Sequence, residues 1–408
     1  MRTRLLFTIW GCRLLAACSG GSSSSPADAG ADGAMDATTD VGPADTGTPP
    51  IPTPPVPDFA LGEAIDTAPL GWTWVPFPDS HCMDGSPFGI GVNDNPDSEN
   101  VLIFFEGGNL CFDPVSCIGV ANPDGFTASK LLPNVRGHED SLFSRDPTAN
   151  PFGDWSYVYI PYCSGDLHLG NTLNGYHQPG WDQPNQHLGF GNTRQFLERV
   201  VATYGGAQKV LVAGESAGGF GAIGNFDQVA TAFQTVGDPA LYLIDDSGPT
   251  MSNMWLKSCF QDLVIDAFGF RDTPLAEECP DCLNPEAGGL GEIIPFLTAR
   301  YPDARMALTS TTADRTIRGF YGYGYYRTCD FPGVMPPADF EAGLVEIRDV
   351  LTPGDTAFRT YIVEDDFHTL TSHRLDDPRT GGGLGAWLTQ QVTDDPAWTD
   401  VWVPAPAP

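Results

Sequence analysis

Ser216 has the sequence context of a nucleophilic serine. It lies in Gly214-Glu-Ser-Ala-Gly218, which fits the pattern G-x-S-x-G; an apolar run at residues 209–213 precedes it, and a helical pattern over residues 218–233 follows. Between a strand and a helix, this pattern forms a sharp turn that exposes the serine oxygen. We expect Ser216 to attack an acyl carbon while the Ala217 N–H faces the resulting oxyanion. A plain strand-to-helix turn is the alternative.

A serine nucleophile needs a histidine base, and two histidines follow Ser216 along the chain, His368 and His373. In hydrolases that carry the G-x-S-x-G turn, the order along the chain is serine, acid and histidine. His368 comes just after the last long apolar run, residues 359–363, which places it at the end of a predicted strand. We therefore favour His368 as the base, and His373 remains the alternative.

The base needs a carboxylate that orients it, and Asp314 is the favoured candidate. It follows the apolar run at residues 305–310, so it is expected at the same edge as the serine and the histidine. Asp245 and Asp246, which follow residues 240–244, are rivals. For Asp246, however, the neighbouring Ser-Gly pair also fits a turn-capping role.

A glycine-rich segment follows the apolar run at residues 101–105 and could supply further oxyanion donors. It reads Glu106-Gly-Gly-Asn-Leu-Cys111. Glycines let the backbone approach a substrate carbonyl closely. We expect the N–H groups of Gly108 and Asn109 to contribute to an oxyanion hole, with a simple glycine turn as the alternative.

Six apolar runs alternate with loops and helical patterns, an arrangement typical of an α/β fold. The runs cover residues 101–105, 155–161, 209–213, 240–244, 305–310 and 359–363, and two of the helical patterns cover residues 192–204 and 218–233. Continuous apolar strands of this kind predict a mostly parallel sheet with helices on both faces, as in α/β-hydrolases. Active sites of such sheets lie at the carboxyl ends of the strands.

The composition excludes some classes of partner. Among 408 residues there are 52 acidic and 20 basic side chains, and the formal net charge is −32. Nucleic acid is not expected as a partner, because its phosphates require Lys and Arg. No run of eighteen or more apolar residues predicts a membrane-spanning helix.

The N-terminus predicts export. Residues 1–18 combine a basic start with a short apolar stretch that ends at Leu15-Ala-Ala-Cys18, which resembles a bacterial lipoprotein signal with Cys18 as the lipidated residue. An ordinary secretory signal is the alternative. Residues 19–57 are rich in Gly, Ser, Asp and Pro and are expected to form a disordered linker. A folded domain is expected over residues 58–403, with a tail at 404–408.

Eight cysteines follow Cys18, and in an exported chain this even number predicts disulfides. Cys259, Cys279, Cys282 and Cys329 are expected to form two bridges of open connectivity. The pair Cys279 and Cys282 could alternatively supply half of a zinc site.

Four motifs, in order along residues 70–375, resemble the pectin acetylesterase family, which includes plant enzymes and Notum-like animal carboxylesterases. They are Cys82-Met-Asp-Gly-Ser-Pro87, Phe105-Glu-Gly-Gly-Asn-Leu-Cys111 with Cys117, Asp154-Trp155 through Tyr162-Cys163-Ser-Gly-Asp166, and Gly214-Glu-Ser-Ala-Gly-Gly219. The resemblance implies disulfides between Cys111 and Cys117 and between Cys82 and Cys163. Where this chain has Asn109 and Leu110, several family members have Trp, so the substrate wall is expected to differ.

The resemblance also implies chemistry. Ser216, Asp314 and His368 correspond to a catalytic triad, and Gly108, Asn109 and Ala217 correspond to the oxyanion hole. The family removes acyl groups without a metal or organic cofactor. We therefore expect a serine esterase that removes acetyl groups from a polysaccharide such as pectin.

Three alternatives to pectin deacetylation remain. Pectin is a polyanion, and its repulsion by this acidic chain favours another acylated glycan. A small ester or a longer acyl ester is compatible with the same chemistry. A surface lipoprotein that binds glycans without catalysis belongs to another class, because a fold alone does not establish activity.

Overall fold

The computed structural model describes residues 53, 55–56, 58–173, 184–325, 329, 333–354 and 357–405. The expected signal with Cys18 and nearly all of the expected linker lie outside the described residues, as do residues 406–408 of the tail. The described residues belong to one unit that spans residues 50–408. Within them, no helix has the length and apolar character that a bilayer crossing requires.

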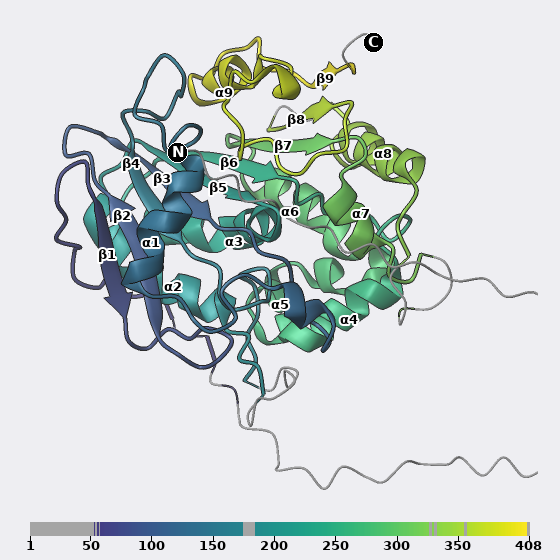
Figure 1. Cartoon of the computed structure of the whole chain (residues 1–408), viewed down its shortest axis with the longest axis horizontal. Helices are drawn as coiled ribbons and strands as arrows, with labels where there is room; N and C mark the ends of the chain where they lie inside the picture. Colours follow the sequence, from purple (N-terminus) through teal and green to yellow (C-terminus); the bar gives the residue numbers. More distant parts are fainter. Residues whose placement is uncertain are drawn as a thin grey trace, which may run out of the picture. The chain divides into compact units, whose positions relative to one another are not determined.

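A nine-stranded sheet crosses the described part of the chain (Figure 1). The strands are β1 Trp72–Phe77, β2 Phe88–Asn93, β3 Asn100–Phe105, β4 Ser156–Ile160, β5 Lys209–Glu215, β6 Ala240–Asp246, β7 Arg305–Thr311, β8 Phe358–Val363 and β9 Val401–Val403. Their order in the sheet is β1-β2-β4-β3-β5-β6-β7-β8-β9. Strand β2 runs antiparallel to β1 and β4, and every other neighbouring pair is parallel.

The parallel centre of the sheet arises from the continuous apolar runs. In β3, β4, β5 and β7 almost every residue is buried, because helices cover both faces and leave no side for polar residues. The six runs expected from the sequence correspond to β3 to β8. Strands β1, β2 and β9 were not expected: β2 is interrupted by Gly89 and Gly91, and β9 has three residues.

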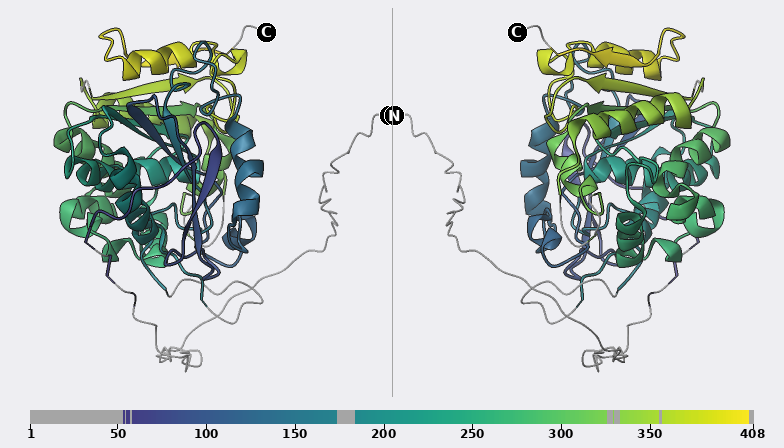
Figure 2. Two further views of the ribbon diagram at one scale, coloured as in Figure 1. Left: turned by 90° about the vertical axis from the view of Figure 1, so that its left-hand side faces the viewer. Right: turned by 90° about the vertical axis from the view of Figure 1, so that its right-hand side faces the viewer.

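Helices pack against both faces of the sheet. They are α1 Ala128–Val135, α2 Gly189–Tyr204, α3 Ala217–Gln234, α4 Ser258–Phe268, α5 Leu275–Glu278, α6 Ile293–Arg300, α7 Arg315–Tyr321, α8 Pro337–Glu346 and α9 Leu384–Val392. Figure 2 shows α1, in blue, on one side of the sheet and the teal and green helices on the other. The expected fold class, a mostly parallel α/β-hydrolase-like sheet with helices on both faces, is confirmed.

Among the residues that the structure describes, four disulfides join loops around the sheet. Cys82 pairs with Cys163 and Cys111 with Cys117, the two pairings that the resemblance implies. Cys259 pairs with Cys329, and Cys279 pairs with Cys282. The last bridge contradicts the zinc alternative, because both thiols that the metal would need are joined to each other.

Candidate active site

Ser216 occupies the turn between β5 and α3, and its backbone is strained. Its φ of 59° and ψ of −125° place a residue with a side chain where glycine is favoured. The two glycines of the motif make this turn possible. A Cβ at Gly214 would lie 2.0 Å from the carbonyl oxygen of Gly218, and a Cβ at Gly218 would lie 2.0 Å from that of Phe105. The chain therefore closes tightly around the serine and presents it at the carboxyl edge of the sheet.

Asp314 follows β7 at the same edge and is completely buried. Its Oδ1 atom accepts hydrogen bonds from the N–H groups of Thr316 and Ile317, at 2.9 and 3.0 Å, so the residue is the N-cap of α7. Its Oδ2 atom accepts a hydrogen bond from His368 Nδ1 at 2.6 Å. Capping fixes the carboxylate, and the fixed carboxylate holds the imidazole.

His368 follows β8 and presents its second ring nitrogen for chemistry. Because Nδ1 donates to Asp314, Nε2 carries the lone pair of the neutral ring. Nε2 is buried and makes no hydrogen bond with the residues that the structure describes. Burial opposes protonation of the ring, but the bond to Asp314 and its charge outweigh burial and raise the pKa of His368 above its ordinary value. The ring is therefore equipped to accept a proton.

The rival residues have other partners. His373 Nδ1 faces Arg379 Nη2 at 3.2 Å and not a carboxylate. Asp245 accepts a hydrogen bond from the Gly248 N–H at 2.8 Å, which is a turn-capping contact. The structure thus joins His368 to Asp314 and leaves His373 and Asp245 outside that pair.

The expected oxyanion loop passes directly over Ser216. A Cβ at Gly107 would lie 2.6 Å from the Glu215 carbonyl oxygen and 2.9 Å from Ser216 Cβ. Asn109 has a positive φ of 65°, and its side-chain amide donates to the Gly119 carbonyl at 2.5 Å. The Cys111–Cys117 bridge closes the same loop. This segment is held against the serine by covalent and polar contacts.

The three expected oxyanion donors lie on both sides of the serine. Gly108 and Asn109 belong to the loop after β3, and Ala217 is the first residue of α3. The N–H of a first helical residue has no acceptor within its own helix, so the Ala217 N–H is available to a ligand. The positive end of the α3 dipole adds to the attraction for a negative oxygen there.

Glu106 begins the oxyanion loop and is a buried acid that sequence reasoning did not single out. Burial raises the pKa of its carboxyl to about 7 and outweighs the hydrogen bond that it accepts from the Tyr162 N–H at 2.7 Å. The Glu215 charge also raises this pKa. A carboxyl that is partly neutral near neutral pH places less negative charge behind the position where an oxyanion forms.

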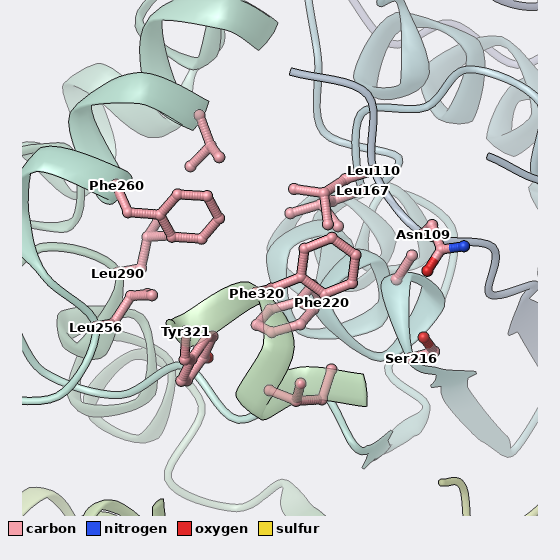
Figure 3. Close-up of a pocket in the computed structure, with 13 residues that line it drawn as sticks. Asn109, Leu110, Leu167, Ser216, Phe220, Leu256, Phe260, Leu290, Phe320 and Tyr321 are labelled. Atoms are coloured by element: carbon pink, nitrogen blue, oxygen red, sulfur yellow. The ribbon is translucent and has the colours of Figure 1, made fainter. Parts of the chain in front are cut away.

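An apolar pocket opens at Ser216, and its empty volume is about 490 Å³ when its opening to solvent is included. Its lining residues come from the oxyanion loop, α3, α4 and α7 and from the segments after β4, before α3, before α4 and before α6. They are Asn109, Leu110, Leu167, Ser216, Ala217, Phe220, Leu256, Phe260, Val264, Leu290, Ile317, Phe320 and Tyr321. Figure 3 shows Ser216 and Asn109 at one end, Phe220 and Phe320 in the middle, and Leu256, Phe260 and Leu290 at the other end. The Tyr321 hydroxyl is engaged by the Pro249 carbonyl, so the pocket offers few free polar groups.

Sequence reasoning did not find most of this pocket wall. Leu256, Phe260 and Leu290 lie far along the chain from Ser216, and their approach to it depends on how the segments after β6 pack. The residues on α7 follow the capping Asp314 directly, so a helix that starts at Asp314 was the one feature of the sequence from which these wall residues could have been inferred.

No group of three or more His, Cys, Asp or Glu residues suited to a metal ion occurs in the described ranges.

Comparisons with known proteins support the resemblance seen in the motifs. Residues 74–265, a little under half of the chain, match the model of the pectinacetylesterase family, which confirms the expected resemblance for this segment. The matched segment contains Ser216 and the expected oxyanion loop and ends before Asp314 and His368. The assignment of those two residues therefore depends on geometry and chain order.

Relatives and a solved structure extend the likeness. The chain is 31% identical to the mouse palmitoleoyl-protein carboxylesterase NOTUM over 182 residues and to the human protein over 183 residues, 42% of this chain in both cases. The aligned part spans about a third (34%) of the length of these two relatives. A structure of the Wnt deacylase Notum from Drosophila superposes with a TM-score of 0.53 at 18% identity, covering 75% of this chain and 87% of that one. That superposition shows a shared fold.

The buried Glu106 predicts a specific dependence of stability on pH. Because its pKa is about 7 in the folded protein and lower in the unfolded chain, the folded state binds more protons between these values, and stability falls as pH rises through that window. Glu106→Gln keeps an acceptor for Tyr162 but does not titrate. Between about pH 5 and about pH 8, we expect wild type to lose about 2 kcal/mol more unfolding free energy than this variant.

Urea denaturation of both proteins at each pH measures that difference. Glu139→Gln, on an exposed side chain, is the matched control and should follow wild type. Parallel pH profiles for wild type and Glu106→Gln would show that the Glu106 pKa is not raised.

Proposed function

Since residues 74–265 match the pectinacetylesterase family model, we propose that this protein is a serine carboxylesterase with Ser216, His368 and Asp314 as its triad. The observation that carries the proposal is the 2.6 Å bond between His368 Nδ1 and a buried Asp314 at the edge of the sheet where the half-buried Ser216 lies. That bond fixes the tautomer that a general base needs. A protein that only bound glycans would have no use for this pair.

Ester hydrolysis in this site proceeds through an acyl-enzyme. His368 Nε2 takes the Ser216 proton as the serine oxygen bonds to the acyl carbon, and the carbonyl electron pair moves onto its oxygen. When this intermediate collapses, the bond to the alcohol breaks and the imidazolium returns the proton to the alcohol. Water, deprotonated by the same imidazole, then attacks the acyl-enzyme. The bond from the acyl carbon to Ser216 breaks, the imidazolium returns the proton to the serine oxygen, and the acid is released.

Two electrostatic contributions stabilise the transition states. The N–H groups of Gly108, Asn109 and Ala217 donate to the developing oxyanion, and each donor of this kind is worth on the order of a hundredfold in rate. Asp314 stabilises the imidazolium, in keeping with the raised pKa of His368.

The acyl pocket favours chains longer than acetyl. An acetyl group would occupy only the end of the pocket near Ser216, and the apolar walls of α4 and α7 would stay exposed to water. Each methylene buried there contributes about 0.8 kcal/mol. We therefore place a longer acyl ester ahead of acetylated pectin as the substrate. The relatives named above carry a fatty acyl specificity in their names, which agrees with this choice.

The alcohol part of the substrate is expected to be neutral. The net charge of −32 repels polyanions such as unesterified stretches of pectin. An acylated neutral glycan or a small ester fits this surface better.

We also propose that the chain is exported and acts outside the cytoplasm. The four disulfides support this, because such bonds persist in oxidising compartments. In this proposal residues 1–18 are a lipoprotein signal, Cys18 carries the lipid anchor, and residues 19–57 link it to the catalytic domain at 58–403, which a short tail follows.

A series of p-nitrophenyl esters tests the proposed activity. With acetate, butyrate, octanoate and palmitate esters, kcat/KM should rise at least tenfold from acetate to its maximum, because the burial of a few methylenes contributes enough binding free energy for a tenfold change. Ser216→Ala should lower hydrolysis of every ester by at least about a thousandfold. Activity that survives this substitution would refute the triad, and a maximum at acetate would restore deacetylation as the leading reaction.

Filling the far end of the pocket should shorten the preferred chain. Leu290→Phe adds volume beyond Phe220 and Phe320, so kcat/KM for the palmitate ester should fall about tenfold while that for butyrate stays within about twofold. Leu132→Phe, on a half-exposed site of α1, is the matched control and should leave the series unchanged. Equal losses for short and long esters would contradict the placement of the acyl chain.

Neutralising the triad acid should change the pH dependence of the reaction. Because Asp314 raises the pKa of His368, the acid limb of the kcat/KM profile should move to lower pH in Asp314→Asn. The maximal rate should fall about ten-thousandfold, because the amide no longer holds the correct tautomer. A full pH–rate profile with butyrate ester measures both effects, and an acid limb that stays in place would exclude Asp314 as the partner of the base.

A further inference from the structure

Asp246 is a completely buried carboxylate to which the proposed reaction assigns no role. It ends β6, which lies between the nucleophile strand β5 and the acid strand β7. Moving an ionised carboxylate out of water is costly unless hydrogen bonds replace its hydration. The partners of those hydrogen bonds show which segments of the chain Asp246 connects.

The carboxylate of Asp246 binds the segment that follows His368. Its Oδ1 atom accepts from the Leu370 N–H at 3.1 Å, and its Oδ2 atom accepts from the Thr371 N–H at 2.6 Å and the Thr371 hydroxyl at 2.5 Å. Leu370 and Thr371 are both fully buried, so these contacts are shielded from water. Three charge-assisted hydrogen bonds therefore anchor the chain two and three residues beyond the proposed base.

The backbone of the same residue binds the nucleophile turn. The Ser216 N–H donates to the Asp246 carbonyl at 2.7 Å. One residue thus holds Ser216 through its main chain and the histidine loop through its side chain. The remaining contacts of the carboxylate, from the hydroxyls of Thr309 at 2.9 Å and Ser247 at 3.2 Å, secure it within the sheet.

A second contact links the histidine loop to the nucleophile turn. Thr369, next to His368, donates its hydroxyl to Glu215 Oε2 at 3.1 Å, and Glu215 is next to Ser216. The other oxygen of Glu215 faces His138 Nε2 at 3.4 Å. This contact is partly open to solvent, with 16% of the Glu215 side chain exposed, whereas the Asp246 contacts are not.

We propose that Asp246 is a positioning residue that sets the place of His368 relative to Ser216. The inference rests on the proposed function, because it concerns the same serine and histidine. Asp314 fixes the orientation of the imidazole from the Nδ1 side, and Asp246 fixes where the histidine loop lies above the nucleophile turn. Proton transfer from Ser216 depends on both, since an error of about 1 Å in such a site can cost about a hundredfold in rate.

Two hydroxyl deletions of the same kind test this role without removing a charge. Thr371→Val removes one of the three hydrogen bonds between the histidine loop and Asp246, and Thr309→Val removes a hydroxyl from the same carboxylate on the side of the sheet. With butyrate ester, Thr371→Val should lower kcat about tenfold, with KM within about twofold and the acid limb of the pH profile in place. Thr309→Val should lower kcat by less than about twofold.

Asp246→Asn is the stronger change, because the amide nitrogen that replaces one carboxylate oxygen cannot accept a hydrogen bond from Thr371 or, with the amide turned over, from the Leu370 N–H. It should lower kcat about a hundredfold, again with little change in KM. Thermal melting of each full-length, disulfide-intact variant establishes that it is folded. If Asp246→Asn does not fold, the pair of threonine variants decides the question.

The outcomes separate this inference from the proposed function. Equal losses of kcat in Thr371→Val and Thr309→Val, or a folded Asp246→Asn with kcat within about threefold of wild type, would overturn the positioning role alone. Absence of ester hydrolysis by wild type, or full activity of Ser216→Ala, would overturn the proposed function and this inference with it.

Discussion

The buried carboxylate of Asp314 is the contact on which the proposed site depends most. One oxygen caps α7, and the other holds the imidazole of His368. Helix α7 in turn supplies Ile317, Phe320 and Tyr321 to the apolar pocket. A single side chain therefore fixes both the base and one wall of the pocket, and the acyl group would be held in register with the proton acceptor.

The sheet brings several acids to one edge, and the protein stabilises each in a different way. Asp314 has a histidine and a helix N-terminus, and Asp246 has five hydrogen bonds from amides and hydroxyls. Burial raises the pKa of both Asp246 and Glu106, and it raises that of Glu106 to about 7. Negative charge near an oxyanion hole opposes catalysis, so a carboxyl that can be neutral suits the position behind that loop.

Sequence reasoning located the parts of the site that local chemistry determines. The glycines around Ser216 and in the loop after β3 are required by contacts within a few residues of a strand end, so the motif alone predicts the turn. Asp314 and His368 could be inferred from their order and from the apolar runs before them. The structure joins these two residues directly, although they are 54 positions apart.

Features that depend on long-range packing could not be inferred in the same way. Leu256, Phe260 and Leu290 are ordinary apolar residues, and only the fold brings them to the pocket. The two hydrogen bonds from Thr371 to Asp246 join residues 125 positions apart, and no sequence motif predicts them. The antiparallel strands β1 and β2 were missed because their glycines and prolines weaken the strand pattern.

The central claim is that Ser216 is a nucleophile activated by His368, and covalent labelling tests it most directly. A fluorophosphonate reacts with a serine only when a base removes its proton, and mass spectrometry of the digested protein locates the adduct. The account predicts one adduct, on the peptide that contains Ser216, and its loss in His368→Ala. An adduct on another serine, or equal labelling of Ser216 in His368→Ala, would contradict it.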